Sequence, residues 1–188
     1  MPDSLKTKNA LAASLKALMQ QRPFSRISVS DICEGCGMTR KSFYYHFKDK
    51  YDLVNWIFDT EFFSRISLSQ YESGWLLLTD ICRYFYSERD FYRCALAIQG
   101  QNSFQDYFSV KMRPLVPRFL SGHAADSPDG EFFLNFLYEG LIQAILYWLS
   151  REETPPAEEF LEKMKRMLLL FSEDVLHTLG EDTHKPQA

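Results

Sequence analysis

Apolar residues recur along this chain of 188 residues at the three- and four-residue spacing of helices that face a core. Leu11, Leu15 and Met19 place such a face on a first helix over residues 4–21. Pro23 should end that helix, because the residue before a proline avoids the helical region. No alternation typical of strands stands out, so the pattern predicts an all-α protein. Further helices are expected over residues 29–36, 39–47, 50–67, 74–85, 90–98, 103–120, 131–150 and 160–179.

The second and third of these helices are joined by a short turn at Gly37. Glycine is suited to the left-handed backbone of such a turn, and Thr39 can cap the helix that follows. Phe43 and Phe47 form the inner face of that helix. Its outer face carries Arg40, Lys41, Ser42, Tyr44, Tyr45 and His46. Two helices at a glycine turn, the second presenting donors near its start, are typical of a helix-turn-helix that enters a DNA major groove.

The charge of the chain supports this interpretation through its distribution. The net charge is -4, which taken alone disfavours nucleic acid. Residues 1–50, however, hold nine Lys or Arg and four Asp or Glu, whereas the remainder holds twelve and twenty-one. A basic head on an acidic body can hold DNA at one end while the body resists non-specific adhesion. We place a DNA-binding domain at residues 1–50, since Lys48-Asp49-Lys50 breaks the helical pattern there, and a helical body at residues 51–188.

The residues expected to contact DNA lie on and around the second helix of the helix-turn-helix. Arg40 and Lys41 occupy its first turn, the part that meets base edges in such motifs. Arginine is the best bidentate reader of guanine. The alternative is a merely solvated basic face, which the turn register and the exposed aromatic residues disfavour. The expected DNA contacts are Ser28, Thr39, Arg40, Lys41, Ser42, Tyr44, Tyr45, His46 and Lys50.

The last two predicted helices are candidates for a dimer interface. The helix over residues 131–150 is apolar nearly all round, so it needs partners on several sides. Gly140 and Ala144, four residues apart, would let a neighbouring helix approach closely. Such helix pairs commonly form a four-helix bundle with their copy, and the alternative is that both are core helices of a monomer. The expected interface residues are Phe133, Leu137, Gly140, Leu141, Ala144, Trp148, Met164, Met167, Phe171 and Val175.

Aromatic residues in the middle helices suggest a cavity for a small organic effector. Aromatic residues at helical spacing also form ordinary cores. The second hypothesis is that the body is an interaction module controlled by a partner protein. A large apolar cavity would favour the effector, and a filled core with an exposed apolar patch would favour the partner. The candidate effector-binding residues are Trp56, Trp75, Tyr84, Phe85, Phe104, Tyr107, Phe108, Tyr138, Gln143 and Tyr147.

Residues suited to catalysis or metal binding are scattered. Cys33 and Cys36 form a CxxC pair, but a zinc site needs about four ligands and the sequence supplies no second pair nearby. A thioredoxin-type motif would follow a strand, and both cysteines fall on an inner helix face, so packing explains them better. No Gly-rich phosphate loop, HExxH or GxSxG occurs in the sequence. We expect no enzyme activity, no metal and no cofactor.

Targeting and membrane segments are not expected either. Lys6, Lys8 and Lys16 interrupt the early apolar stretch that a signal peptide would need. The longest apolar runs are shorter than the roughly 20 residues of a membrane span. We expect a cytoplasmic protein without membrane association, whose cysteines are reduced.

Taken together, the motif residues resemble the N-terminal signature of the TetR/AcrR family of transcriptional regulators. The run from Phe47 to Phe58 further resembles the branch that contains regulators of dihydroxyacetone kinase operons. Cys33 and Cys36 stand where alanine is usual in the family, and Lys41 stands where a small residue is frequent. The matching positions are Ser28, Val29, Asp31, Ile32, Cys36, Gly37, Met38, Thr39, Phe43, Tyr44, Phe47, Lys50 and Leu53.

The resemblance implies an all-helical homodimer of about nine helices per subunit, with a helix-turn-helix head and a divergent ligand-binding body. It implies that Tyr44 and Lys50 hold the phosphate backbone of a palindromic operator and that the protein acts as a repressor. Release from DNA would follow the binding of a small-molecule effector. In the alternative, a regulator or activator is controlled by a partner protein that binds the body.

Overall fold

The computed structural model describes residues 2–100, 102–115 and 128–182. Over these ranges the chain forms nine α-helices and no strand, with three short 3-10 helices between α1 and α5, so the prediction of an all-α protein is confirmed. The α-helices are α1 (Pro2–Met19), α2 (Val29–Glu34), α3 (Arg40–His46), α4 (Lys50–Glu61), α5 (Gly74–Ser87), α6 (Arg89–Leu96), α7 (Phe104–Met112), α8 (Gly130–Ser150) and α9 (Ala157–Asp182). The 3-10 helices are η1 (Phe24–Arg26), η2 (Phe63–Arg65) and η3 (Leu68–Gln70).

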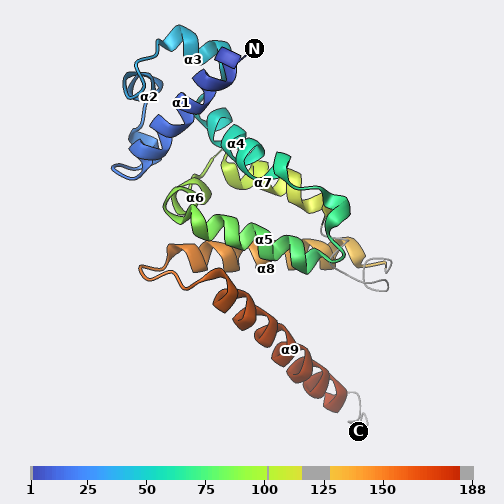
Figure 1. Ribbon diagram of the computed structural model, residues 1–188. Helices are drawn as coiled ribbons and strands as arrows, with labels where there is room; N and C mark the ends of the chain where they lie inside the picture. The colour runs from blue at the N-terminus through green and yellow to red at the C-terminus, as the bar shows by residue number, and fades with distance from the viewer. Residues whose placement is uncertain (1, 101, 116–127, 183–188) are drawn as a thin grey trace.

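The head consists of α1, α2 and α3, which lie at one end of the molecule (Figure 1). Leu11 and Leu15 of α1 are fully buried against Ile32 of α2 and Phe43 of α3, as the periodic pattern predicts. Burying side chains of this size contributes about 1.5–3 kcal/mol each, which is enough to hold three short helices together. The core of the head therefore rests on one large apolar residue or more from each helix.

Helix α4 connects the head to the body and packs into both (Figure 1). In the middle of α4, Trp56 packs edge-on against Phe47 of the head, with ring centroids 5.6 Å apart. Two residues further on, Phe58 is fully buried in the body. The boundary that the sequence places after residue 50 thus lies at the start of a helix shared by both parts, and it stays a prediction.

Helix α4 ends at Glu61, earlier than the predicted helix over residues 50–67. The chain continues through η2 and η3, a stretch that contains three serines. Serine disfavours helix interiors because its hydroxyl bonds to nearby polar groups instead. Ser64 bonds to the carbonyl of Thr60 at 3.0 Å, and the hydroxyls of Ser67 and Ser69 lie 2.8 Å apart.

The body is built from α5, α6, α7 and α8 around a cluster of aromatic rings. Phe85 and Tyr92 stack with centroids 4.4 Å apart, and Phe58, Phe104 and Phe108 surround them. All five rings are buried. Aromatic pairs in such geometry contribute about 0.5–1.5 kcal/mol beyond the area that they bury, so this cluster is the centre of the body.

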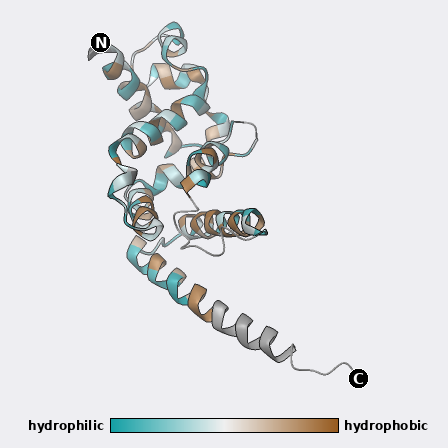
Figure 2. Ribbon diagram, turned by 90° about the vertical axis from the view of Figure 1, so that its right-hand side faces the viewer, coloured by the Kyte–Doolittle hydropathy of each residue, from teal (hydrophilic) through white to brown (hydrophobic). Residues whose placement is uncertain are grey.

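Helix α9 packs on α5 at its start and then extends away from the rest of the chain (Figures 1 and 2). The indole of Trp148 in α8 stacks on Phe160 at 4.6 Å, and Arg83 of α5 pairs with Glu158 at 2.8 Å. Beyond Leu161, which is buried, Met167 to Leu170 are all exposed. Helix α9 therefore has an anchored first part and a second part whose described side chains lie in solvent.

Candidate nucleic-acid interface

The entry to the helix-turn-helix is fixed by a reciprocal cap at Ser28. The Ser28 hydroxyl accepts from the amide of Asp31 at 3.2 Å, and the Ser28 amide donates to the Asp31 carboxylate at 2.7 Å. Arg22 pairs with the same carboxylate at 3.0 Å. The hydrogen bonds from Ser28 and the nearby guanidinium of Arg22 lower the pKa of Asp31 from 3.8 to about 2. The side chain of Ser28, a predicted DNA contact, is thus engaged in capping α2 while the residue remains exposed.

The turn between α2 and α3 depends on Gly37, as predicted. Its φ is +67°, in the left-handed region, and the amide of Met38 donates to the carbonyl of Cys33 at 2.9 Å. Thr39 then caps α3 by accepting from the amide of Ser42 at 3.1 Å. These local bonds satisfy both ends of the turn, so a short recognition helix can form next to its partner helix.

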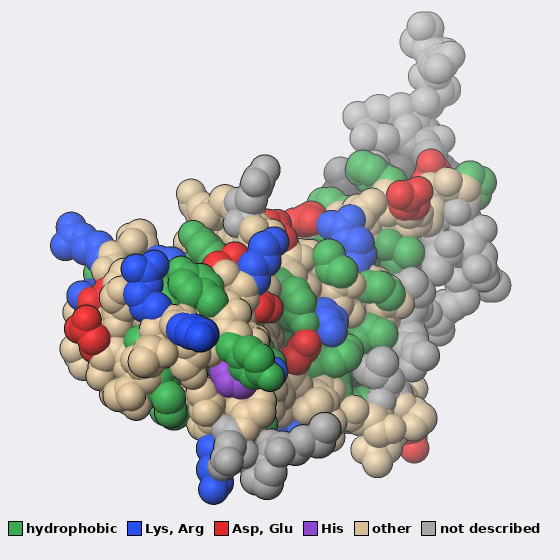
Figure 3. Space-filling view, turned by 90° about the horizontal axis from the view of Figure 1, so that it is seen from above, with side chains coloured by type: hydrophobic (Ala, Val, Ile, Leu, Met, Phe, Trp, Pro, Cys, Tyr) green, Lys and Arg blue, Asp and Glu red, His purple; other side chains and the backbone are tan. Residues whose placement is uncertain are grey.

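Helix α3 has one buried and one exposed face. Phe43 and Phe47 are buried, with centroids 5.7 Å apart, and they fix the rotation of the helix. Arg40, Lys41 and Tyr44 are exposed, Tyr45 is 83% exposed, and Ser42 and His46 are half-buried. A view from the head end shows several Lys and Arg side chains spread over this end of the molecule (Figure 3). The arrangement places cations and hydrogen-bond donors on the side that would meet a groove.

Two ring contacts order the exposed face of α3. The guanidinium of Arg40 lies over the ring of Tyr44, 5.9 Å from its centroid. The rings of Tyr45 and His46 meet edge-on at 4.9 Å. Holding a side chain in place before binding lowers the entropy that binding costs. Arg40 is therefore partly ordered above the face that the sequence assigned to base recognition.

Lys50 occupies a different setting from the one expected. Its ammonium donates to the carbonyls of Phe24 and Ile27 at 2.7 Å each and lies 4.3 Å from the centroid of the Phe24 ring. Burial lowers the pKa of Lys50. An ammonium has three donors, so one remains for a phosphate in this conformation. Lys50 ties η1 to the start of α4, and its contact with DNA stays a prediction.

The residues that set the angle between α1 and α2 were missed by reasoning from the sequence. The Ser14 hydroxyl donates to the carbonyl of Ile32 at 2.8 Å, and Gly35 lies directly beside it. Arg22, which pairs with Asp31, was missed as well. The available signal was a small polar residue on the apolar face of the first helix and a second glycine two positions before Gly37.

The predicted interface residues of α8 differ in exposure within the subunit, and their role in a dimer stays a prediction. Trp148 is 1% exposed, because it packs between Tyr86 and Phe160 and its Nε1 donates to the carbonyl of Pro155 at 2.8 Å. Phe133, Leu137, Leu141 and Ala144 are half-buried at the edge of the packed face. Gly140 is exposed, as expected. The outward stripe, which lies about one residue round the helix from the predicted one, consists of Phe132, Phe136, Gly140, Gln143 and Tyr147.

On α9, the predicted interface residues differ in exposure. Met164 is half-buried and Met167 is exposed. Leu168, Leu169 and Leu170 are also exposed, although the sequence did not single them out. The side chains of Phe171 and Val175, also assigned to the interface, lie outside those that the structure describes.

The candidate effector-binding residues do not line one cavity. Phe85, Phe104 and Phe108 are packed in the aromatic centre, whereas Gln143 and Tyr147 lie on the outer face of α8. The remaining five lie in separate surroundings. Trp56 packs on Phe47, Trp75 lies beneath Lys165, Tyr84 bonds to Glu61, Tyr107 bonds to Asp59, and Tyr138 bonds to Ser109.

An apolar cavity of about 30 Å³ lies between α5, α7 and α8. Phe108 and Tyr138 are the members of the candidate effector set that border it. Its other lining residues are Leu78, Ile81, Met112, Leu141, Ile142 and Ile145. Sites for drug-sized ligands have volumes of roughly 300–1,000 Å³, so in this conformation the described core is filled.

Among the described residues, no group of three or more His, Cys, Asp or Glu is placed to hold a metal ion. Cys33 is buried, and the Cys36 thiol bonds to the carbonyl of Ile32 at 3.3 Å. Burial raises the pKa of both thiols. Both cysteines therefore serve in packing within the head.

Helix α8 is long and apolar enough to cross a membrane by length and composition alone, contrary to what the short apolar runs suggested. Core helices of soluble proteins meet the same criterion. Only 28% of its apolar window is buried within the subunit, however. Its outer apolar stripe therefore needs a covering that the described subunit does not supply.

Comparison with known proteins places both parts of the chain. Residues 11–57 match the model of the bacterial regulatory proteins of the tetR family, and residues 76–169 match a transcriptional regulator C-terminal region. A curated relative, the HTH-type dhaKLM operon transcriptional activator DhaS of Lactococcus lactis subsp. lactis (strain IL1403), is 30% identical over 123 residues. That alignment spans 64% of this chain and 64% of the relative's length.

Solved structures share the fold. The dihydroxyacetone kinase operon activator DhaS has a TM-score of 0.62 at 23% identity, covering 87% of this chain and 94% of that one. A TetR transcriptional regulator from Streptococcus agalactiae 2603V has a TM-score of 0.63 at 21% identity, covering 88% and 95%. NalD, the secondary repressor of the MexAB-OprM multidrug efflux pump in Pseudomonas aeruginosa, has a TM-score of 0.63 at 18% identity, covering 87% and 96%.

Proposed function

Since this chain belongs to the TetR family of transcriptional regulators, we propose that it binds a palindromic operator as a homodimer through α3. The carrying observation is the division of α3 between a buried face at Phe43 and Phe47 and an exposed face at Arg40, Lys41, Tyr44 and Tyr45. Arg40 and Lys41, in the first turn, read base edges. Phosphate, sugar and thymine methyl groups are contacted by the other exposed or half-buried residues of this region, which are Thr39, Ser42, Tyr44, Tyr45, His46 and Lys50 with its remaining donor.

Binding to the DNA upstream of its own gene tests this proposal. Wild type and Arg40→Ala are compared on upstream and random duplexes across a salt series. We expect wild-type affinity for both duplexes to fall with salt and the upstream duplex to be preferred. Arg40→Ala should lose a large part of that preference, since a bidentate base contact contributes about 1–3 kcal/mol of discrimination. Equal affinity of the wild type for both duplexes would refute sequence-specific binding.

The homodimer is supported by two exposed apolar surfaces on α8 and α9. Phe132, Phe136 and Tyr147 are 76%, 60% and 70% exposed, and Met167 to Leu170 are exposed on α9. Figure 2 shows hydrophobic positions, in brown, on both helices. A second copy related by a two-fold axis would cover the outward stripe of α8 and part of the exposed apolar surface of α9. The covering of α8 by a second subunit also accounts for its apolar outer face in a cytoplasmic protein.

The filled core of the body supports control by a partner protein over release by a small effector. The cavity of about 30 Å³ at Phe108 and Tyr138 has room for about one water molecule. Ligand titrations monitored by thermal shift, set beside co-purification with candidate partners, distinguish the two modes. A small molecule that raises the melting temperature and releases DNA would favour the effector.

The likeness to the Lactococcus activator favours activation over the repression that the sequence resemblance implied. Transcription from the upstream promoter should therefore fall when the gene is deleted and return with complementation. A rise on deletion would instead mean that the protein is a repressor.

A further inference from the structure

Helix α1 is joined to the body by a cluster of charged side chains that we call the Lys16 latch. It consists of Lys16 of α1, Glu61 at the end of α4 and Glu88 at the corner between α5 and α6. The ammonium of Lys16 lies 2.6 Å from a carboxylate oxygen of Glu61 and 3.0 Å from one of Glu88. It also lies 5.4 Å from the centroid of the Phe91 ring. One cation of the head thus holds two elements of the body, and its side chain is only 20% exposed.

The latch continues into the aromatic centre of the body. The hydroxyl of Tyr84 donates to the same oxygen of Glu61 at 3.0 Å, and the hydroxyl of Tyr92 donates to Tyr84 at 3.0 Å. Burial raises the pKa of both tyrosines, so both hydroxyls stay protonated and able to donate. Tyr92 is fully buried and stacks on Phe85. A continuous chain of hydrogen bonds therefore runs from the head helix to the rings at the centre of the body.

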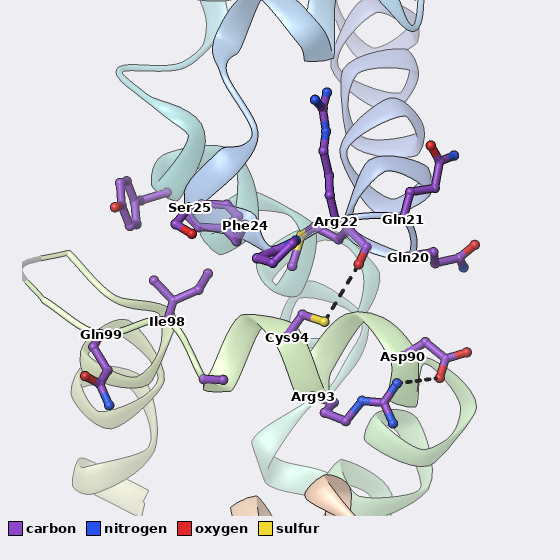
Figure 4. Close-up of a pocket in the computed structure, with 14 residues that line it drawn as sticks. Gln20, Gln21, Arg22, Phe24, Ser25, Asp90, Arg93, Cys94, Ile98 and Gln99 are labelled. Atoms are coloured by element: carbon purple, nitrogen blue, oxygen red, sulfur yellow. Dashed lines mark hydrogen bonds and ion pairs between the residues drawn. The ribbon is translucent and has the colours of Figure 1, made fainter. Parts of the chain in front are cut away.

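Next to the latch, the head and the body are separated by a groove. It has a volume of about 960 Å³ and lies between the end of α1 with η1 on one side and α6 on the other (Figure 4). Met19 and Cys94 both line the groove and are in contact, because the Cys94 thiol donates to the carbonyl of Met19 at 3.8 Å. Lys16 lies one turn of α1 before Met19. The head therefore has space to tilt on this side, and Lys16 is placed at the edge of that space.

We propose that Lys16 is a positioning residue that sets the tilt of the head on the body, and so the half-site spacing that the dimer accepts. This inference rests on the proposed binding of a palindromic operator by a homodimer. Half-sites in such operators lie about one helical turn apart, roughly 34–36 Å, and one base pair changes the separation by about 3.4 Å. A small tilt of each head would therefore exchange one preferred spacing for another.

Electrostatics makes the latch more than a passive contact. Without the ammonium, the carboxylates of Glu61 and Glu88 would lie close together with no cation between them, and their repulsion would drive α4 and the α5–α6 corner apart. Loss of Lys16 should thus shift or broaden the range of angles that the head adopts relative to the body. Removing one of the two carboxylates as well should relieve the repulsion and narrow this range of angles again.

Operators with varied spacing test this inference. The half-site is taken from selection with the wild type, and the centre-to-centre spacing is changed by one base pair in either direction. The proteins are the wild type, Lys16→Met, Lys16→Arg and the double variant Lys16→Met with Glu88→Gln. Lys163→Met is the matched control, because Lys163 also lies 2.6 Å from a glutamate, Glu159, but within one exposed helix.

We expect Lys16→Met to change the affinity ratio between the best and the altered spacings by roughly fivefold or more, the lower end of coupling between distant sites. Lys16→Arg and Lys163→Met should keep the wild-type ratio, and the double variant should lie between the two. Base preference within one half-site should be unchanged in all of them. Glu88→Gln alone, with a smaller change of the ratio, provides the same test if Lys16→Met fails to fold.

The outcomes separate the latch from the proposed function. A wild type that binds no specific DNA overturns the proposed function and this inference together. A wild type that prefers one spacing, beside Lys16 and Glu88 variants that keep that preference and lose only thermal stability, overturns the latch alone. In that case Lys16 would be a structural ion pair.

Discussion

A methyl group on Gly35 would lie 2.3 Å from the hydroxyl oxygen of Ser14. The two residues lie where α1 contacts the end of α2, and the same hydroxyl donates to the carbonyl of Ile32 at 2.8 Å. Gly35 has an ordinary helical φ of -61°, so the requirement for glycine here comes from space and not from backbone conformation. The turn glycine Gly37 shows the reverse, because its φ is +67° and nothing lies within 4 Å of an added Cβ.

Gly35→Ala should destabilise the head by about 1–2 kcal/mol, because the Ser14 hydroxyl must turn away and lose its buried hydrogen bond. In a Ser14→Ala background the same change should be nearly neutral, since the Cβ of residue 14 lies at an ordinary 3.5 Å. Denaturant unfolding of the four proteins of this double-mutant cycle measures the coupling. Additive effects would mean that the two residues do not limit each other.

Gly37→Ala should cost about 1–2 kcal/mol through backbone strain alone, because an L-residue resists the left-handed region. Gly37→Asn should cost less, since asparagine visits that region more readily. Thermal unfolding and binding to an upstream duplex check both variants. An alanine variant as stable as the asparagine variant would show that the turn rearranges.

Acid should weaken the head through Asp31. The pKa of this carboxyl is lowered to about 2 in the folded protein, so its charged form contributes stability above its ordinary pKa near 4. That contribution is lost as the pH falls from about 4 through about 2. Unfolding midpoints of wild type and Asp31→Asn measured between pH 5 and pH 2 should converge toward the acid end. Parallel curves would contradict the assignment.

Phe136→Asp should weaken self-association at least about tenfold, because it places a charge in the centre of the outward stripe of α8. Val110→Asp is the matched control, since Val110 is 73% exposed on α7 and lies outside that stripe. Sedimentation over a concentration series distinguishes the two. A Phe136 variant that associates like the wild type would exclude this face from the dimer.

Much of the architecture followed from patterns within single helices. The periodic apolar residues predicted the all-α class, and Gly37 and Thr39 marked the turn and the cap that the structure contains. Lys50 shows where such reasoning ends. Its partners are the backbone carbonyls of Phe24 and Ile27, which no side chain in the sequence announces.

The burial of Trp148 within the subunit could not be predicted for a related reason. Trp148 belongs to an apolar set that runs nearly all round the helix, so periodicity alone could not say which side is packed. Trp148 is buried because it packs on Phe160 and donates to the carbonyl of Pro155, and both of these residues lie beyond the end of α8. The filled core could not be predicted either, because the volume left between helices depends on how all of their side chains fit together.

The exposed leucines of α9 leave apolar surface uncovered in a single subunit. Between Met167 and Leu170 the helix extends away from the body with apolar side chains exposed to water. Dimerisation would therefore stabilise this part of α9. The working form would then depend on the number of molecules in the cell. At low concentration the regulator would be monomeric, and modest extra synthesis would convert it to the dimer that we propose binds DNA. The amount of protein synthesised would thereby regulate DNA binding, in addition to any effector or partner protein that binds the body.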